Sequence, residues 1–336
     1  MNTRNITAFA AFAAACLAGS TAYAGPKPVK APKTVEPPQE SCITGDIGFD
    51  VVSNYISKGI VYNNQGGILQ PYADLHFRIY KGAGALTSVT ADIGIWNSFH
   101  SHTGAGIGPV GGTAQNRFPG AGPGSQTTAN WFEFDFIAGL TFNFDKLAIG
   151  GYFKTYESPS SVFQNTYTAG ITVAYDDSAA LGAFALHPYA LVELQLEGTT
   201  GNNFGIVNGP FVPAVIQQHG RGQYYEVGIA PGHTWGDLTL SLPIKGGFGS
   251  GGFYLGNRGF GYVSVGLRAD YALHFIPACL GKWTVSAGGT YYRLGGNNDL
   301  SSGPLSGAAG LGTARLVIPQ QDRNQWVFQG GLKVAF

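Results

Sequence analysis

Residues 131–144 read WFEFDFIAGLTFNF and carry the pattern that decides the fold. The even positions from Phe132 to Phe144 are all apolar, whereas most odd positions, Glu133 and Asp135 among them, are polar or small. An alternation with a period of two predicts a β-strand with one apolar face and one polar face. A strand of this length, above about ten residues, suits a tilted crossing of a lipid bilayer.

The same alternation recurs along the chain, clearly in residues 69–80 and 262–275. It predicts an all-β fold, a single antiparallel transmembrane β-barrel of about 12 strands, because a sheet surrounded by lipid must close on itself to satisfy its edge groups. An even count places both termini on one side of the membrane. The expected strands are residues 45–56, 68–80, 88–97, 130–143, 147–156, 165–175, 188–197, 223–232, 237–246, 260–274, 283–294 and 324–336.

Alternation alone also fits a soluble β-sandwich, in which the apolar faces of two sheets meet. Three features favour the barrel: the length of the strands, the clustering of aromatic residues at strand ends, and the C-terminus. These aromatic residues would form girdles at the membrane interfaces: Tyr55, Trp131, Phe144, Tyr175, Tyr271 and Trp283. The final strand resembles the C-terminal insertion signal of bacterial outer-membrane barrels through its alternating Trp326, Phe328, Leu332, Val334 and terminal Phe336.

Composition points the same way. Charged residues make up 11% of the 336 residues, against roughly 25% in ordinary soluble domains. The 19 basic and 19 acidic residues balance, which argues against a nucleic-acid partner because such proteins carry a basic excess.

The connections between the expected strands fall into two groups. Those after odd strands are mostly long, as in 98–129, 198–222 and 295–323, and those after even strands are mostly short, with 176–187 as an exception. Bacterial barrels pair short periplasmic turns with long extracellular loops. We therefore expect both termini in the periplasm.

Residues 1–24 have the pattern of a secretory signal peptide: Arg4, a short apolar run, and the small-residue site Ala22-Tyr23-Ala24. An alternative in which Cys16 is the acylated residue of a lipoprotein lacks the usual preceding leucine. Residues 25–41 are rich in proline and lysine and predict an extended periplasmic tether. The expected domains are therefore the signal peptide, the tether and a barrel over 42–336, located in the outer membrane of a Gram-negative-type bacterium.

Two cysteines remain after the signal peptide, Cys42 and Cys279, and the expected topology places both at the periplasmic end of the barrel. Disulfides are permitted in exported proteins, so we predict a Cys42–Cys279 bond. Two free thiols are the alternative.

Alternate residues of each strand are expected to face the lumen. The expected inward acids outnumber the inward bases by ten to five, a net charge of −5, which favours a weakly cation-preferring pore because charged rings set ion preference. The acids are Asp46, Asp50, Asp74, Asp92, Glu133, Asp135, Glu193, Glu197, Glu226 and Asp270; the bases are Arg78, Lys154, Lys245, Arg268 and Lys333, and His76 and His274 also face inward.

The start of the barrel, GDIGFDVVSNYISKGIVYNNQGGILQPYADLHF, resembles the TorF-like putative porins of proteobacteria. That family shows Ser-x-Tyr-x-x-Arg-Gly-Ile in its opening strand, and the matching residues here are Ser53, Tyr55, Lys58, Gly59 and Ile60, with lysine in place of arginine. The resemblance covers about a sixth of the chain. It implies an outer-membrane channel of poorly defined substrate.

Three functions remain open on the sequence. A porin-like channel would pass small hydrophilic solutes or ions through an aqueous lumen; barrels of about 8 strands are filled by side chains and those of 16–18 are open, so twelve lies between. A non-conducting surface, structural or adhesion barrel would have its lumen charges paired and would act through its extracellular loops. A lipid hydrolase at the rim would need a serine and a base, and the sequence contains no GxSxG motif.

We expect a non-enzymatic protein without catalytic residues, cofactor or metal. The expected partners are the lipid bilayer and lipopolysaccharide, the barrel-assembly machinery, which would read the C-terminal strand, and small hydrophilic solutes.

Overall fold

The computed structural model describes residues 41–63, 66–101, 131–159, 165–197, 222–250, 253–254, 259–295 and 322–336. The expected signal peptide and nearly all of the tether lie outside these residues. The strands are β1 (Ile43–Val52), β2 (Tyr55–Ser57), β3 (Ile60–Asn63), β4 (Ile68–Lys81), β5 (Ser88–His100), β6 (Trp131–Phe144), β7 (Leu147–Glu157), β8 (Thr166–Tyr175), β9 (Tyr189–Glu197), β10 (Gln223–Ile229), β11 (Gly232–Trp235), β12 (Leu238–Ser241), β13 (Ile244–Ser250), β14 (Phe260–Ala272), β15 (Lys282–Leu294) and β16 (Asn324–Ala335). The short helices are α2 (Ser178–Leu181), η1 (Gly182–Phe184) and η3 (Ala278–Leu280).

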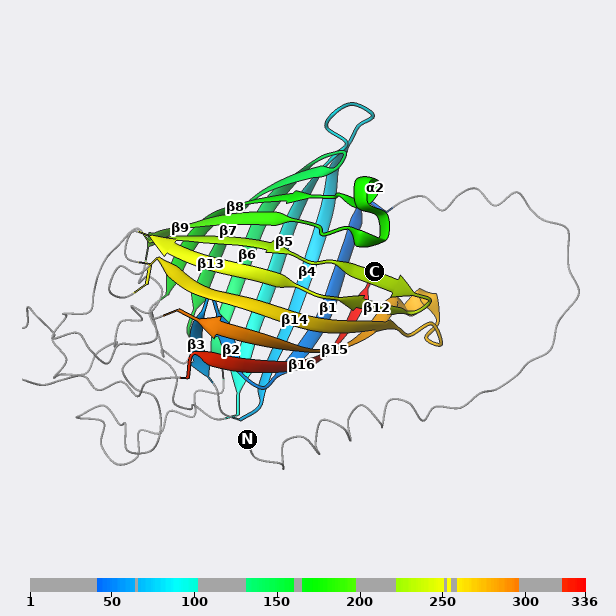
Figure 1. Cartoon of the computed structure of the whole chain (residues 1–336). Coiled ribbons are helices and arrows are strands. Elements are labelled where there is room, and N and C mark those ends of the chain that lie inside the picture. The colour runs from blue at the N-terminus through cyan, green and yellow to red at the C-terminus, as the bar shows by residue number, and fades with distance from the viewer. Residues whose placement is uncertain are drawn as a thin grey trace, which may run out of the picture. The chain divides into compact units, whose positions relative to one another are not determined.

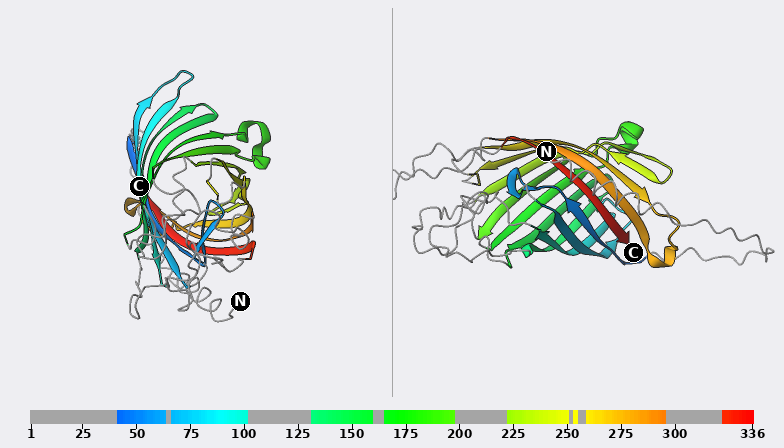
Figure 2. Two further views of the ribbon diagram at one scale, coloured as in Figure 1. Left: turned by 90° about the vertical axis from the view of Figure 1, so that its left-hand side faces the viewer. Right: turned by 90° about the horizontal axis from the view of Figure 1, so that it is seen from below.

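The wall is a closed antiparallel sheet (Figures 1 and 2). Neighbouring strands of the wall are antiparallel, and β1 pairs directly with β4 because β2 and β3 form a separate two-stranded sheet. The ring closes where β1 pairs with β16, so that Asp46 lies opposite Ala335 and Val52 opposite Gln329. The order around the ring is β1, β4, β5, β6, β7, β8, β9, β10, β13, β14, β15 and β16. The predicted closed barrel of twelve strands is confirmed.

Two strands of the wall are interrupted by proline. β10 continues as β11 beyond Pro231, and β12 continues as β13 beyond Pro243, while the pairing register stays the same on both sides of each break. Proline has no N–H to donate to the ladder. The interruptions therefore reflect missing hydrogen bonds rather than extra strands.

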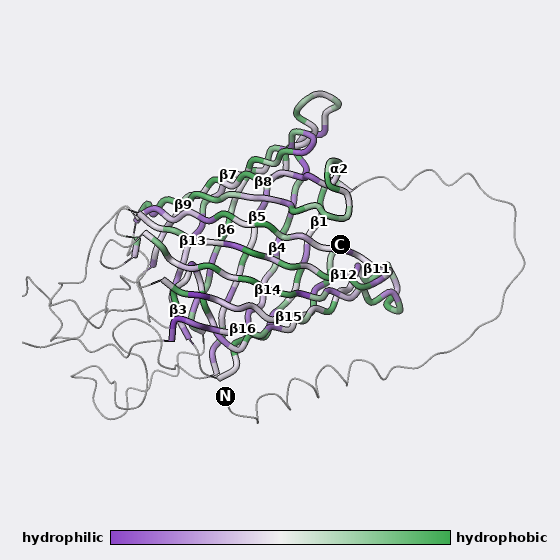
Figure 3. Tube along the Cα trace, in the orientation of Figure 1, coloured by the Kyte–Doolittle hydropathy of each residue, from purple (hydrophilic) through white to green (hydrophobic). Residues whose placement is uncertain are grey.

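The outward face of the wall is apolar. Ile79, Ile171 and Leu267 are 62%, 59% and 58% exposed although each lies in the middle or second half of a strand. Figure 3 shows apolar and polar residues alternating along the strands. A soluble protein would not leave such a surface open to water.

The two ends of the barrel differ. What we call the turn end has the connections 82–87, 145–146, 176–188, 236–237 and 273–281, together with the first residue of β1 and the last of β16. The opposite end, the hairpin end, has the longer connections and the β2–β3 hairpin. The exceptional segment 176–187 contains α2 and η1 and connects β8 to β9 at the turn end. Among the described residues no helix is long and apolar enough to span a membrane.

The predicted disulfide is absent: Cys42 and Cys279 are free and exposed. Cys42 directly precedes β1 and Cys279 precedes β15, and these two strands flank β16 on opposite sides. Two strand spacings amount to about 10 Å, beyond the roughly 7 Å that a disulfide tolerates between Cα atoms. The common position at one end was correct, but being at the same end does not make the two cysteines neighbours.

Candidate functional site

The predicted strands do not include one feature of the structure, a hairpin that lies inside the barrel and is not part of its wall. β1 ends at Val52 instead of continuing to residue 56, and β2 and β3 pair only with each other as a separate two-stranded sheet. Lys58 and Gly59 form the turn with φ values of 52° and 78°. Two successive positive φ angles are the requirement of the type I′ turn, whose twist matches a tight hairpin. Gly59 was the sequence signal for it, because glycine adopts positive φ readily.

One face of the hairpin packs on the wall formed by β5 and β6. Tyr55 stacks on Tyr62 with ring centroids 5.0 Å apart and contacts Trp96 at 5.6 Å. Its hydroxyl donates a 2.9 Å hydrogen bond to Oε2 of Glu133. Tyr55 is therefore buried inside the barrel, and its expected place in an interfacial girdle was wrong.

The tip of the hairpin reaches the opposite wall. The Lys58 ammonium forms an ion pair with Glu193 of β9 and donates a 2.7 Å hydrogen bond to the Tyr156 hydroxyl of β7. In the ring of twelve strands β9 is six places from β1 in either direction. The Tyr254 hydroxyl donates a 2.6 Å hydrogen bond to the Lys58 carbonyl. The hairpin therefore crosses the full interior of the barrel and is tied at both sides.

Tyrosines hold a second carboxylate nearby. Glu226 of β10 accepts hydrogen bonds from the hydroxyls of Tyr189, Tyr224 and Tyr262 at 2.7, 2.6 and 2.5 Å. The Lys245 ammonium lies 3.7 Å from the same carboxylate. Charge-assisted hydrogen bonds of this kind are the stronger ones, so the position of Glu226 is fixed.

A third charged group lies on β6 and β7. The Lys154 ammonium is 2.7 Å from Oδ2 of Asp135, and the side chain of Asp135 is 1% exposed. Glu133 is 3% exposed. Ionised groups this deeply buried need partners; Asp135 has the Lys154 ammonium, and Glu133 has the Tyr55 hydroxyl.

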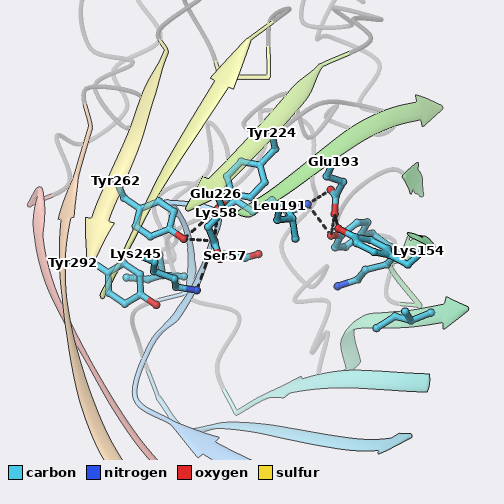
Figure 4. A pocket seen from close by; sticks show the side chains of 14 residues that line it. Ser57, Lys58, Lys154, Leu191, Glu193, Tyr224, Glu226, Lys245, Tyr262 and Tyr292 are labelled. Atoms are coloured by element: carbon cyan, nitrogen blue, oxygen red, sulfur yellow. Dashed lines mark hydrogen bonds and ion pairs between the residues drawn. The ribbon is translucent and has the colours of Figure 1, made fainter. Parts of the chain in front are cut away.

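These groups surround a pocket of about 410 Å³ beneath the tip of the hairpin (Figure 4). Its lining comes from the hairpin and from β6, β7, β9, β10, β13, β14 and β15. The size falls within the roughly 300–1,000 Å³ of small-molecule sites. Its polar lining includes Lys58, Lys154, Glu193, Glu226, Lys245 and several tyrosines.

The turn end carries a second, more open group of charges. His76 Nδ1 lies 2.7 Å from Oδ1 of Asp92, and its Nε2 lies 3.8 Å from Asp46. The Thr141 hydroxyl donates a 3.0 Å hydrogen bond to Asp92. The side chains of His76, Asp92 and Asp46 are 38%, 31% and 24% exposed, so solvent reaches them.

Another group at this end joins strands that are not neighbours. Arg268 of β14 pairs with Asp270 at 2.9 Å and lies within electrostatic range of Asp50 on β1. Lys333 of β16 is a further neighbour of Asp50. β14 and β1 are separated by two strands in the ring, so these charges influence one another although they do not lie on adjacent strands.

The remaining candidates are less closely joined. Asp74 lies near Asp46, His76 and Asp92. Arg78 is partly buried on β4, and Glu197 is exposed at the last residue of β9. The side chain of His274 is 73% exposed and pairs with Asp237 at 3.1 Å in the turns. That these residues line a conducting lumen stays a prediction.

A serine and a histidine do meet beneath the hairpin. Ser98 Oγ is 2.8 Å from His100 Nε2, and the Asn63 amide nitrogen is 2.9 Å from His100 Nδ1. An amide nitrogen donates, so the ring hydrogen lies on Nε2 and faces Ser98, the reverse of what a general base needs. The three residues are 0–2% exposed and His100 stacks on Phe132 at 4.3 Å. This arrangement leaves no room for a substrate and anchors β3 to the wall.

Among the described residues, one group could bring three metal ligands together: Asp176, Asp177 and His187. Its carboxylates already accept backbone hydrogen bonds, from Ser178 N to Asp176 and from Leu186 N and His187 N to Asp177. These bonds, that of His187 foremost, hold the pKa of Asp177 below its ordinary value of 3.8. The geometry of the turn therefore explains the cluster.

No family model matches the chain. No curated protein matches it either.

Solved structures do resemble it. An outer membrane channel of the COG4313 group from Pseudomonas putida F1 has 8% sequence identity and a TM-score of 0.44, covering 92% of this chain and 100% of that one. The NanC porin has 8% identity and a TM-score of 0.38, covering 87% and 98%. Outer membrane phospholipase A from Escherichia coli has 12% identity and a TM-score of 0.33, covering 87% and 92%. We draw no functional conclusion from similarities this low.

Proposed function

We propose that the chain forms an outer-membrane channel that passes small hydrophilic solutes or ions, with a weak preference for cations. The observation that carries the proposal is the inverted distribution of polarity. Ionised side chains such as Lys154, Glu226 and Lys245 line a pocket inside a closed wall whose outward face is apolar. Such a wall is built to sit in lipid around an aqueous interior.

The preference for cations follows from the acids of the turn end. Asp46, Asp50, Asp74 and Asp92 come from neighbouring strands, and Asp92 lies 2.7 Å from Nδ1 of His76. Solvent-exposed carboxylates attract cations and repel anions. The test is the reversal potential of the refolded protein in a planar bilayer under a KCl gradient.

We expect the sign of the reversal potential to show a preference for K⁺ over Cl⁻. The double variant Asp74→Asn, Asp92→Asn should bring the reversal potential closer to zero. A matched control is Asp237→Asn, in the turn outside the strands. Anion preference would overturn the charge assignment.

The second candidate is a non-conducting structural barrel, and the hairpin favours it because it crosses the interior with its charges paired. Absence of discrete current steps, from protein shown to be folded by its heat-dependent mobility on a gel, would select this candidate.

The outer-membrane location, cleavage near Ala24, insertion through the strand that ends at Phe336, and contact with lipopolysaccharide belong to the same proposal. Trp326, Phe328 and Phe336 are 55%, 39% and 55% exposed, which suits contact with lipid or with an insertion machine.

Membership of the TorF-like porins stays a hypothesis. Its motif coincides with the hairpin. Ser53 exchanges hydrogen bonds with Phe328 of β16, Ile60 is buried, and Tyr55, Lys58 and Gly59 make the contacts described above.

A further inference from the structure

The surroundings of the Lys58 ammonium have the composition of an amine receptor. The Tyr156, Tyr224 and Phe253 rings have their centroids 4.6, 5.4 and 5.8 Å from Nζ. The Glu193 carboxylate and the Tyr156 hydroxyl accept hydrogen bonds from the same nitrogen. Aromatic faces together with a carboxylate bind ammonium groups through cation–π attraction and charge pairing. We call these residues the ammonium cage.

The cage is held together without the help of Lys58. Oε2 of Glu193 accepts hydrogen bonds from the hydroxyls of Tyr152 at 2.8 Å and Tyr156 at 3.3 Å. The Glu193 side chain is 4% exposed. A carboxylate fixed by two wall tyrosines keeps its position when the lysine leaves, so the site is preorganised for another cation.

Lys58 reaches the cage on a separate piece of chain. The hairpin pairs with no strand of the wall, so displacing its tip would break side-chain contacts but no ladder of the barrel. A lysine at φ 52° is also an unusual choice, because type I′ turns prefer Asn or Gly there.

The cage opens to a space from which a solute can approach. Lys58, Tyr156, Glu193 and Tyr224 all line the pocket of about 410 Å³. We propose that the ammonium cage binds solutes that carry a primary ammonium group, and that Lys58 occupies it as a tethered competitor. This inference rests on the proposed channel function and names its solute class.

The test removes the Lys58 ammonium group from the cage by substitution. Lys58→Asn retains the turn, because Asn is favoured at positive φ. Isothermal titration of the refolded protein in detergent with n-butylammonium chloride should give binding about 10-fold tighter than in the unmodified protein, since a tethered ligand competes at an effective concentration in the millimolar range. Tetramethylammonium, which has no N–H to donate, should bind more weakly than butylammonium.

Two further variants keep the outcome interpretable. Lys245→Asn removes one positive charge from the same pocket but leaves Lys58 in the cage, so it should bind butylammonium less tightly than Lys58→Asn does. Glu193→Gln added to Lys58→Asn should abolish the gain. Equal affinity of Lys58→Asn and Lys245→Asn would overturn the inference, because the gain would then be one of net charge only.

The current steps of the same preparations in KCl test the channel independently. If current steps are seen but Lys58→Asn shows no gain in amine affinity, the channel function is supported and the proposed role of the ammonium cage is wrong. If Lys58→Asn gains amine affinity but no current steps are seen, the ammonium cage is supported as the binding site of a non-conducting barrel, and the channel function is wrong.

Discussion

The two ends of the barrel interior handle charge in opposite ways. At the hairpin end Glu133, Asp135 and Glu193 are 1–3% exposed, and each carboxylate contacts a lysine or a tyrosine. At the turn end the His76 and Asp92 side chains are 38% and 31% exposed. The same kinds of residue are therefore structural ties at one end and hydrated surface at the other. The difference is made by the hairpin of residues 55–63 and the tyrosines that face it.

The largest effect should come from removing the hairpin. Replacing residues 55–63 with a short Gly-Ser linker should raise the single-channel conductance in KCl several-fold, because it clears a segment that crosses the interior. Val52 and Ile68 are paired neighbours, so a short linker joins them without strain. Lys58→Asn, which retains the hairpin, is the control and should change conductance far less. Unchanged conductance in the deletion would mean that the hairpin does not limit the current.

The next prediction compares one carboxylate from each end. Glu193→Gln should lower the free energy of unfolding by about 3 kcal/mol, because it leaves the largely enclosed Lys58 ammonium, whose side chain is 17% exposed, without its counter-charge. Asp270→Asn should cost no more than about 1 kcal/mol, because its pair with Arg268 is partly exposed to solvent. Guanidinium unfolding in lipid vesicles, followed by tryptophan fluorescence, measures both. Equal losses would remove the distinction between the two ends.

A pair of glycines tests the packing of the hairpin. A Cβ on Gly59, at φ 78°, would lie 2.7 Å from Cδ1 of Tyr262 and 2.9 Å from the Gly261 carbonyl oxygen. Gly59→Ala should therefore destabilise the protein by more than about 1 kcal/mol and expose the hairpin to protease. Gly84, in a turn at the other end, has nothing within 4 Å of such a Cβ. Gly84→Ala should be neutral or slightly stabilising, and equal cleavage of the two variants would contradict this.

The smallest effect concerns pH at the turn end. The folded-state pKa of Asp177 is depressed by the backbone N–H groups of His187 and Leu186. Its stabilisation of residues 176–187 is therefore complete above the ordinary value of 3.8 and is lost as pH falls through the depressed value. Hydrogen exchange at the amides of Leu186 and His187, corrected for intrinsic rates, should accelerate over that range. Asp177→Asn should remove the pH dependence, and an unchanged dependence would assign it to another group.

The wall was predictable because one physical rule governs it. Each strand separates an apolar medium from a polar one, so the period of two appears in the sequence, and residues 131–144 formed β6 within one position of the expected bounds. The hairpin was not predicted, because neither of its faces contacts lipid and the alternation therefore does not apply to it. Its residues Ile60, Val61 and Tyr62 are all buried inside the barrel, so they show no alternation.

The contacts between side chains in the interior could not be predicted from the sequence, for a different reason. Glu193 and Lys154 were expected to face inward, but their partners depend on the tilt of the strands and on which residues stand at the same height. In the sequence, Lys58 stood out only as part of the motif shared with the TorF-like porins. Nothing local indicated that it would meet a carboxylate 135 positions later in the chain.

That separation has a consequence for the order in which the molecule assembles. The residues that receive the hairpin follow it by 98 positions at Tyr156, by 135 at Glu193 and by 196 at Tyr254. Contacts between residues so far apart in sequence form late, because the chain between them must first be ordered. We therefore expect the hairpin to reach its place late in assembly, with the lysine hydrated until the strands that carry its partners are in place.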